Sequence, residues 1–180
     1  MGAVLIIMAG LSGTGKTTLA DAVAKTSGAA VFAHDPIESA ILDAGIVRSF
    51  ETGLAAYIVS QRLASDHLAL GQTAIGDACD YVEGARQSWR LIAEERGVPM
   101  LVVECVCSDA ALHRRLVEAR DRGLNASVGE PSWDEVQARV AETPPWPGAL
   151  VVDSVRSLKE NVAVVLARVR EIAGEEATRS

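Results

Sequence analysis

The sequence predicts an α/β domain in which a five-stranded parallel sheet is covered by helices on both faces. Apolar segments of strand length alternate with longer segments of helical periodicity, and the connections between them are short. The first apolar segment, Ala3–Ala9, contains no polar residue, which is typical of a strand buried on both faces. Because parallel strands joined through helices cross over with one hand, a three-layer α/β/α arrangement is expected.

Apolar spacing, glycine and proline mark where each element begins and ends. The pair Asp35-Pro36 predicts a helix start, since proline is favoured in the first helical turn. Gly71 closes one long helix, and Gly97 with Pro99 stops another. Strands are expected at 3–9, 30–33, 73–76, 100–106 and 149–152. Helices are expected from 17, from 35, and at 53–70, 82–93, 109–122, 133–140 and 158–169, with a polar loop at 123–130, a rigid proline-rich connector at 144–147 and a frayed tail from 174. No linker or repeat divides the 180 residues, so residues 1–180 are expected to form one domain.

Composition disfavours several classes of partner. The net charge is −7 and no basic stripe is visible, which disfavours nucleic acid. No apolar run reaches the length of a membrane span, and no secretion leader is expected, because the N-terminal residues show no basic region or cleavage site. The three cysteines show no disulfide framework, as expected for a reduced, cytoplasmic setting.

Residues 10–17 read Gly-Leu-Ser-Gly-Thr-Gly-Lys-Thr and fill every fixed position of the phosphate-binding loop (P-loop) pattern Gly-x-x-x-x-Gly-Lys-[Ser/Thr]. The motif lies between the first strand and the first helix, where backbone N–H groups and the helix N-terminus can face phosphate oxygens. Lys16 can reach the β- and γ-phosphates, and the Thr17 hydroxyl can bind Mg²⁺. The sequence therefore predicts a P-loop NTPase fold with an ATP site formed by Gly10, Leu11, Ser12, Gly13, Thr14, Gly15, Lys16, Thr17 and Thr18.

Two aspartates follow strands that end at the same edge of the predicted sheet, where ligands bind in such folds. Asp77 ends the third strand, and its carboxylate can hold Mg²⁺ opposite Thr17; the alternative is a cap for the next helix. Asp35 ends the second strand and can accept the proton of an acceptor hydroxyl; the alternative is an N-cap before Pro36.

Arginines on the helix before the polar loop are candidates for a lid at about 120–131. Phosphoryl transfer requires positive charge over the γ-phosphate, and Arg120 and Arg115 can supply it. The alternative is a solvated charged face, in which Glu118 and Asp121 are local partners. The helix carries Arg114, Arg115, Arg120 and Arg122.

These positions together resemble the small P-loop kinases of the gluconate kinase and chloramphenicol phosphotransferase type, in the AAA-family ATPase-like group. The resemblance is carried by the loop Gly10–Ala20, by His34-Asp35, by Asp77-Ala78-Cys79-Asp80 with the downstream Arg86, and by the segment Glu104–Arg120. It implies a nucleoside-kinase-like fold with a lid. Arg86 is expected either in the cleft or on the surface.

Two positions depart from this family pattern and concern the acceptor. Glu38 stands where many relatives have a basic residue, and Asp80 replaces the usual asparagine. Tyr57, Gln61 and Trp133 are candidate contacts for the acceptor, although packing explains each of them equally well.

The resemblance implies an enzyme, a monomer or homodimer, that moves the γ-phosphate of ATP to a hydroxyl of a small molecule with the help of Mg²⁺. The alternatives are a nucleotide or polynucleotide-end kinase, or a nonenzymatic ATP-binding partner protein. A GTP switch is disfavoured, because neither Asn-Lys-x-Asp nor Asp-x-x-Gly occurs in the chain. The acceptor is not identified by any motif.

Overall fold

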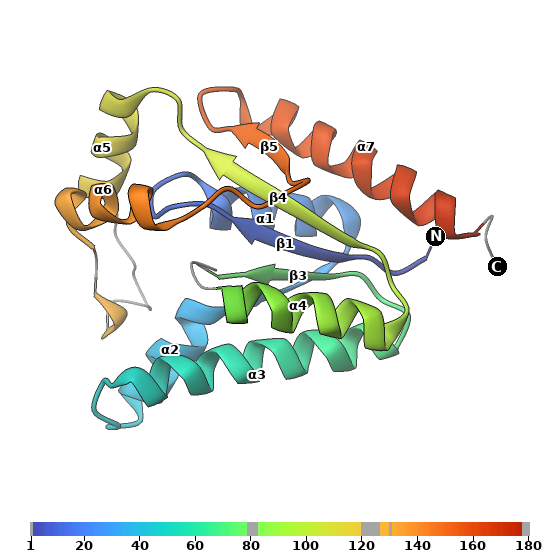
Figure 1. The fold of residues 1–180 in the computed structure, drawn as a ribbon, viewed down its shortest axis with the longest axis horizontal. Coiled ribbons are helices and arrows are strands. Elements are labelled where there is room, and N and C mark those ends of the chain that lie inside the picture. The colour runs from blue at the N-terminus through green and yellow to red at the C-terminus, as the bar shows by residue number, and fades with distance from the viewer. Residues whose placement is uncertain (1, 79–82, 120–126, 130, 178–180) are drawn as a thin grey trace.

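A computed structural model describes residues 2–78, 83–119, 127–129 and 131–177 (Figure 1). Its centre is a five-stranded sheet in the order β2-β3-β1-β4-β5, and every pairing is parallel, which confirms the predicted fold class. The strands are β1 (Leu5–Ala9), β2 (Ala30–Ala33), β3 (Ala74–Asp77), β4 (Met100–Val106) and β5 (Leu150–Asp153).

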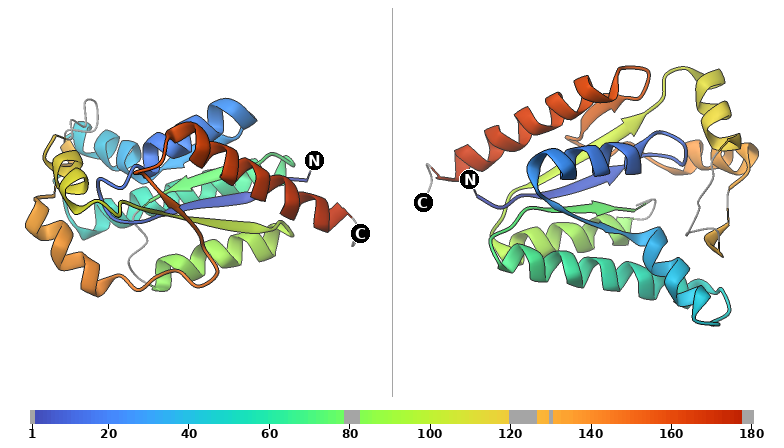
Figure 2. Two further views of the ribbon diagram at one scale, coloured as in Figure 1. Left: turned by 90° about the horizontal axis from the view of Figure 1, so that it is seen from above. Right: turned by 180° about the vertical axis from the view of Figure 1, so that it is seen from behind.

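Helices cover both faces of the sheet, so that the molecule has three layers (Figures 1 and 2). Helices α1 and α7 pack on one face, and α3 and α4 pack on the other. The α2–α3 hairpin and the α5–α6 pair flank the edge where the strands end, whereas both chain termini lie at the opposite edge (Figure 1). The helices are α1 (Lys16–Ser27), α2 (His34–Asp43), α3 (Phe50–Ala69), α4 (Glu83–Arg96), α5 (Ala110–Glu118), α6 (Trp133–Glu142) and α7 (Leu158–Ala177).

The central strand β1 explains why an unbroken apolar run is needed there. All five of its residues are buried. Ile6 and Met8 belong to the core beneath α1 and α7, whereas Leu5 and Ile7 belong to the core beneath α3 and α4. Each such side chain contributes about 1.5–3 kcal/mol by its burial. A polar residue at any of these positions would therefore be unfavourable on either face.

The predicted boundaries hold best for strands. β2 and β4 match their predicted ranges to the residue. Helix α3 begins at Phe50, before the predicted Gly53, because Ser49 and Thr52 form a capping box. The Ser49 hydroxyl accepts a hydrogen bond from the Thr52 amide at 3.4 Å, and the Thr52 hydroxyl accepts one from the Ser49 amide at 3.0 Å. Helix α7 continues to Ala177, past the glycine at 174 where a frayed tail was expected.

The sheet order brings the ends of β1, β2 and β3 together. Met8 pairs with Asp77, and Asp77 pairs with Ala33, so the segments that follow these three strands start side by side. This register places residues 10–17, Asp77 and Asp35 at one edge of the sheet, as the parallel topology predicted. No helix among the described residues is long and apolar enough to cross a membrane.

Candidate functional site

The loop after β1 has a left-handed backbone at each of its three glycines. Gly10, Gly13 and Gly15 have φ values of +125°, +80° and +88°. A Cβ on Gly10 would lie 2.2 Å from the Cys105 carbonyl oxygen, and one on Gly13 would lie 2.5 Å from Cγ2 of Val117. Left-handed residues at such spacing turn successive N–H groups toward a common centre, which makes an anion-binding concavity. The loop therefore has the geometry of a phosphate cradle.

Lys16 begins α1 directly after this loop and is only 8% exposed. Its Nζ donates a hydrogen bond to the Leu11 carbonyl oxygen at 2.9 Å, so the side chain folds back over the loop. A cation is thereby held beside the N-terminus of α1, which itself carries partial positive charge. Both features favour a bound polyanion at this point.

Thr17 and Asp77 meet across the sheet edge. The Thr17 hydroxyl donates to Oδ2 of Asp77 at 2.7 Å, and Asp77 is 7% exposed. Asp77 ends β3 and accepts this hydrogen bond from the first turn of α1, so its carboxylate faces the phosphate loop. A hydroxyl and a carboxylate are oxygen ligands of the kind that Mg²⁺ prefers, so this pair fits the predicted metal.

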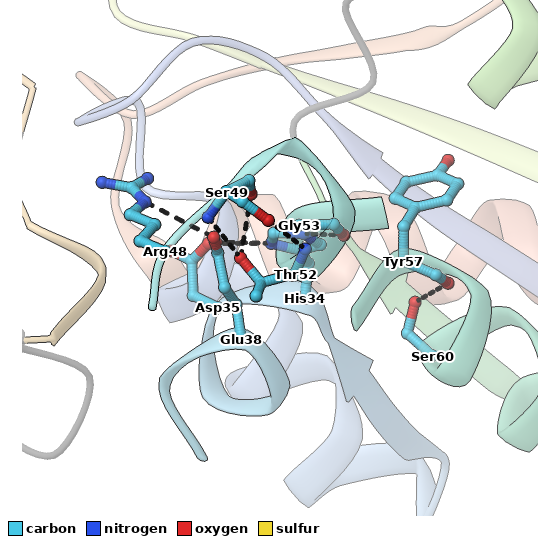
Figure 3. A network of polar contacts seen from close by, with 9 residues as sticks. All are labelled: His34, Asp35, Glu38, Arg48, Ser49, Thr52, Gly53, Tyr57 and Ser60. Carbon is cyan, nitrogen blue, oxygen red and sulfur yellow. Dashed lines mark hydrogen bonds and ion pairs between the residues drawn. The ribbon is translucent and has the colours of Figure 1, made fainter. Parts of the chain in front are cut away.

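A polar network lies on the other side of Asp77, between α2 and α3 (Figure 3). The His34 imidazole is in its centre: Nε2 lies 3.0 Å from the Gly53 carbonyl oxygen, and Nδ1 lies 3.4 Å from Oδ1 of Asp35 and 3.9 Å from Oε2 of Glu38. Glu38 is 4% exposed, and its Oε1 lies 3.4 Å from Nε of Arg48. The network holds the Asp35 carboxylate at the same sheet edge as the phosphate loop, with its side chain 36% exposed.

The structure decides against the N-cap interpretation of Asp35. The N-cap of α2 is Ala33, which has extended backbone angles and no side-chain cap, and Asp35 stands inside the first helical turn. A carboxylate there is still favoured by the helix dipole. The Asp35 side chain therefore contacts His34 and does not serve as the N-cap of α2.

Protonated His34 is expected to stabilise the fold in a pH-dependent way. Burial by itself lowers the pKa of His34, but the Asp35 carboxylate, the Gly53 carbonyl and the charge of Glu38 outweigh it and raise the pKa above 6.5. Stability from a raised pKa is fully present below the unfolded value and is lost as the pH rises through the folded one. The free-energy loss in His34→Gln should thus be largest below about pH 6.5 and shrink as the pH rises further.

Urea denaturation of the parent and of His34→Gln between about pH 5 and pH 8 measures this difference. His67→Gln is the matched control. His67 lies on α3 with its ring 5.5 Å from Phe32, and it is not part of the network around His34 (Figure 3). A loss that stays constant over this range would contradict the role of His34 as an imidazolium between two carboxylates.

The predicted lid lies mostly outside the described residues. Arg120 and Arg122 belong to segment 120–126, which the structure does not describe. Arg115 is exposed on α5. Arg114 pairs with Glu118, with Nε 2.7 Å from Oε1, and so belongs to the solvated charged face. Where the chain is described again, the Ser127 hydroxyl donates to Oδ1 of Asp43 at the end of α2.

Arg86 is neither on the surface nor an open cleft residue. It is 4% exposed, and its guanidinium donates to the carbonyls of Pro144 at 2.7 Å and Pro145 at 3.5 Å. The same group lies 4.9 Å from the ring centroid of Trp146. Arg86 thus attaches the proline-rich connector to α4, which the motif did not indicate.

The candidate acceptor contacts differ in their surroundings. The Tyr57 hydroxyl donates to the Ala85 carbonyl at 3.2 Å, and Trp133 packs edge-on against His113 with ring centroids 5.1 Å apart. Both therefore have packing roles. Gln61 is 9% exposed, and its Nε2 has no hydrogen-bond partner among the described residues.

Two features of the site were missed by sequence reasoning. His113 of α5 is 6% exposed, and its Nε2 lies 2.8 Å from the Ser12 carbonyl oxygen in the loop. A lone histidine on an amphipathic helix carries no local signal for such a contact. A cavity of about 200 Å³ also lies beside the loop, on the face covered by α1 and α7. Its lining includes Gly15, Thr18, Leu116, Ser154, Arg156 and Asn161.

Comparison with known proteins gives the family. A family model described as an AAA domain matches residues 5–143. No curated protein matches the sequence. A solved protein of Chloroflexus aurantiacus j-10-fl has a TM-score of 0.75 at 21% identity, covering 95% of this chain and 98% of its own.

Two further solved structures have named activities. A gluconokinase from Sinorhizobium meliloti 1021 has a TM-score of 0.67 at 18% identity, covering 99% of this chain and 97% of its own. The APS kinase of Mycobacterium tuberculosis in complex with AMPPNP and APS has a TM-score of 0.62 at 20% identity, covering 94% and 98%. The predicted resemblance and fold are both confirmed: the chain belongs to the AAA domain family, and its fold is that of the small P-loop kinases.

Proposed function

We propose that this protein transfers the γ-phosphate of ATP to a hydroxyl group of a small molecule. The observation that carries the proposal is the arrangement at one sheet edge: the phosphate loop with Lys16, the Thr17–Asp77 pair at 2.7 Å, and Asp35 in the first turn of α2, directly after β2. A gluconokinase and an APS kinase share the fold, which supports phosphoryl transfer to an alcohol.

The loop residues 10–18 would hold the phosphates of ATP, and the cavity of about 200 Å³ beside Gly15 and Thr18 would take its base. Thr17 and Asp77 would hold Mg²⁺, which neutralises negative charge on the phosphates when it is bound. Lys16 would stabilise the charge that develops in the transition state. Asp35 would orient the acceptor hydroxyl and accept its proton.

Arg115 on α5 and Arg120 at the start of the lid segment 120–131 remain proposed cations for the γ-phosphate, because both precede or begin that segment. Arg115 is exposed on α5. Their roles depend on the sequence pattern rather than on a contact between described residues.

The overall charge of the chain favours a small acceptor over a polynucleotide. The net charge is −7. A polynucleotide would approach a chain of this net charge against electrostatic repulsion, which supports the small-molecule class.

A panel of acceptors tests the proposal. Hydroxylated metabolites, hydroxylated antibiotics, nucleosides and nucleotides, and 5′-hydroxyl oligonucleotides would each be incubated with ATP and Mg²⁺, and ADP release would be measured above background. Transfer to a small hydroxyl compound is the expected result. Transfer only to nucleotides or oligonucleotide ends would replace the proposal by the polynucleotide alternative. ATP binding without transfer to any class would favour a nonenzymatic partner protein.

Asp77→Asn is expected to raise the Mg²⁺ concentration needed for half-maximal transfer and to lower the rate at saturation. The amide keeps the hydrogen bond from Thr17 but loses the negative charge that attracts the cation, so the melting temperature should change little. A structural cap predicts the opposite: a stability loss of about 1 kcal/mol and an unaltered Mg²⁺ dependence.

Asp153→Asn is the matched control for this experiment. Asp153 also ends a strand, but its carboxylate accepts hydrogen bonds from the amides of Ser108 at 3.2 Å and Val155 at 3.0 Å. Its substitution should leave the Mg²⁺ dependence unchanged. Equal Mg²⁺ curves for Asp77→Asn and the parent would remove Asp77 from the metal site.

A further inference from the structure

We propose that His113 is a positioning residue that orients the Ser12–Gly13 peptide of the phosphate loop, so that the Gly13 N–H faces the bound β- and γ-phosphates. This inference rests on the proposed nucleotide site. It assigns a role to a buried histidine that the P-loop motif does not include.

The contact joins two buried groups. Nε2 of His113 lies 2.8 Å from the Ser12 carbonyl oxygen, and the two residues are each 6% exposed. A carbonyl can only accept, so Nε2 carries the proton and donates it. Because a buried carbonyl without a donor costs roughly 1–3 kcal/mol, this hydrogen bond favours one orientation of the peptide.

The orientation of that carbonyl sets the direction of the next N–H. In a planar trans peptide the C=O and the N–H point to opposite sides. With the Ser12 carbonyl held against α5, the Gly13 N–H points away from α5 and toward the inside of the loop. The rotated peptide would instead present a carbonyl oxygen, a repulsive partner, to phosphate.

Glycine makes this peptide able to rotate, and packing from α5 prevents it. Gly13 has φ of +80° and no side chain that would fix the peptide. A Cβ placed there would lie 2.5 Å from Cγ2 of Val117 and 3.3 Å from Cδ2 of His113, so α5 is in close contact with the loop.

Trp133 holds the imidazole from α6. Its ring is nearly perpendicular to that of His113, at 88°, with centroids 5.1 Å apart. His113 therefore contacts the Trp133 ring of α6 on one side and the Ser12 carbonyl of the phosphate loop on the other. These two contacts restrain the orientation of the imidazole ring.

Two substitutions separate donation from packing. In His113→Gln the side-chain amide nitrogen reaches the position of Nε2 and can donate to the Ser12 carbonyl. In His113→Phe the ring volume against Trp133 is kept and the donor is lost. Dissociation constants for ATP, ADP and AMP with Mg²⁺ would be measured by calorimetry, with the parent first.

We expect His113→Phe to bind ATP and ADP about tenfold more weakly than the parent and AMP equally well, since AMP lacks the β-phosphate. His113→Gln should restore most of the affinity. Unchanged ATP affinity in His113→Phe would overturn the inference alone, and so would equal losses in both variants. A parent that binds neither ATP nor ADP would overturn the proposed function as well.

A measurement on the parent does not depend on how the variants fold. Nitrogen-15 NMR of the histidine ring reports which nitrogen is protonated, and we expect the Nε2–H tautomer for His113, with the Gly13 amide resonance shifting when ADP is added. A His113 ring protonated only on Nδ1 could not donate to Ser12 and would overturn the proposal.

Discussion

Lys16→Ala is expected to reduce phosphate transfer by about 10²-fold or more, with little effect on the fold. Lys16, at the start of α1, is 8% exposed, and its Nζ donates to the Leu11 carbonyl at 2.9 Å. The charge that it places beside the phosphates stabilises the transition state more than the ground state, so kcat should fall more than ATP affinity. Steady-state kinetics with a verified acceptor, together with a melting curve, would measure both effects.

Two further variants make the Lys16 experiment specific. Lys16→Met keeps the aliphatic stem and removes only the charge, so it should lose as much activity as the alanine variant. Lys25→Ala removes an exposed lysine from the last turn of the same helix and should change nothing. Near-normal turnover in Lys16→Ala would rule out the kinase assignment.

Asp35→Asn is expected to lower kcat by about 10²-fold while ATP affinity stays near that of the parent. An acceptor hydroxyl is a poor nucleophile until its proton is accepted, and the amide keeps the shape of the carboxylate without its basicity. The structure strengthens this expectation, since Ala33 and not Asp35 is the N-cap of α2. Transfer to the acceptor and slow hydrolysis of ATP by water should be measured side by side, because hydrolysis does not require a positioned acceptor.

Asp21→Asn, on the exposed side of α1, is the control for a lost carboxylate. If Asp35→Asn transfers phosphate at the parent rate, Asp35 is not the base. Glu38 or Asp80 would then be the next candidate. Glu38 is the weaker of these from its surroundings, since it is 4% exposed and pairs with Arg48 at 3.4 Å. Asp80 lies outside the described residues.

The fold was predictable because its signals are local. The apolar run Ala3–Ala9 predicted a strand buried on both faces. In the structure, β1 lies at the centre of the sheet, with an apolar core on each side of it. Parallel topology then placed the ends of β1, β2 and β3 at one edge without knowledge of any side-chain contact. Where a boundary was wrong, as at the start of α3, a threonine stood at the capping position usually taken by Glu or Gln.

The candidate site was predictable only where the backbone itself dictates residue type. Gly10, Gly13 and Gly15 adopt positive φ, and a side chain at Gly10 would collide with a backbone carbonyl, so the motif had to appear in the sequence. Arg86 shows the limit of this reasoning. Its guanidinium faces carbonyls 58 and 59 residues further along the chain, which its local sequence does not indicate.

Local chemistry requires particular residue types at some positions, and these positions could be identified from the sequence: the apolar strands, the glycines of the phosphate loop, and the Lys16-Thr17 pair that follows them. Tertiary structure alone decided which polar groups meet. Thr17 reaches Asp77 across 60 residues, and His113 reaches Ser12 across 101. The physical reason is that a hydrogen bond depends on distance and direction to within a fraction of an ångström, and for groups far apart in the chain only the packed sheet and helices set those values.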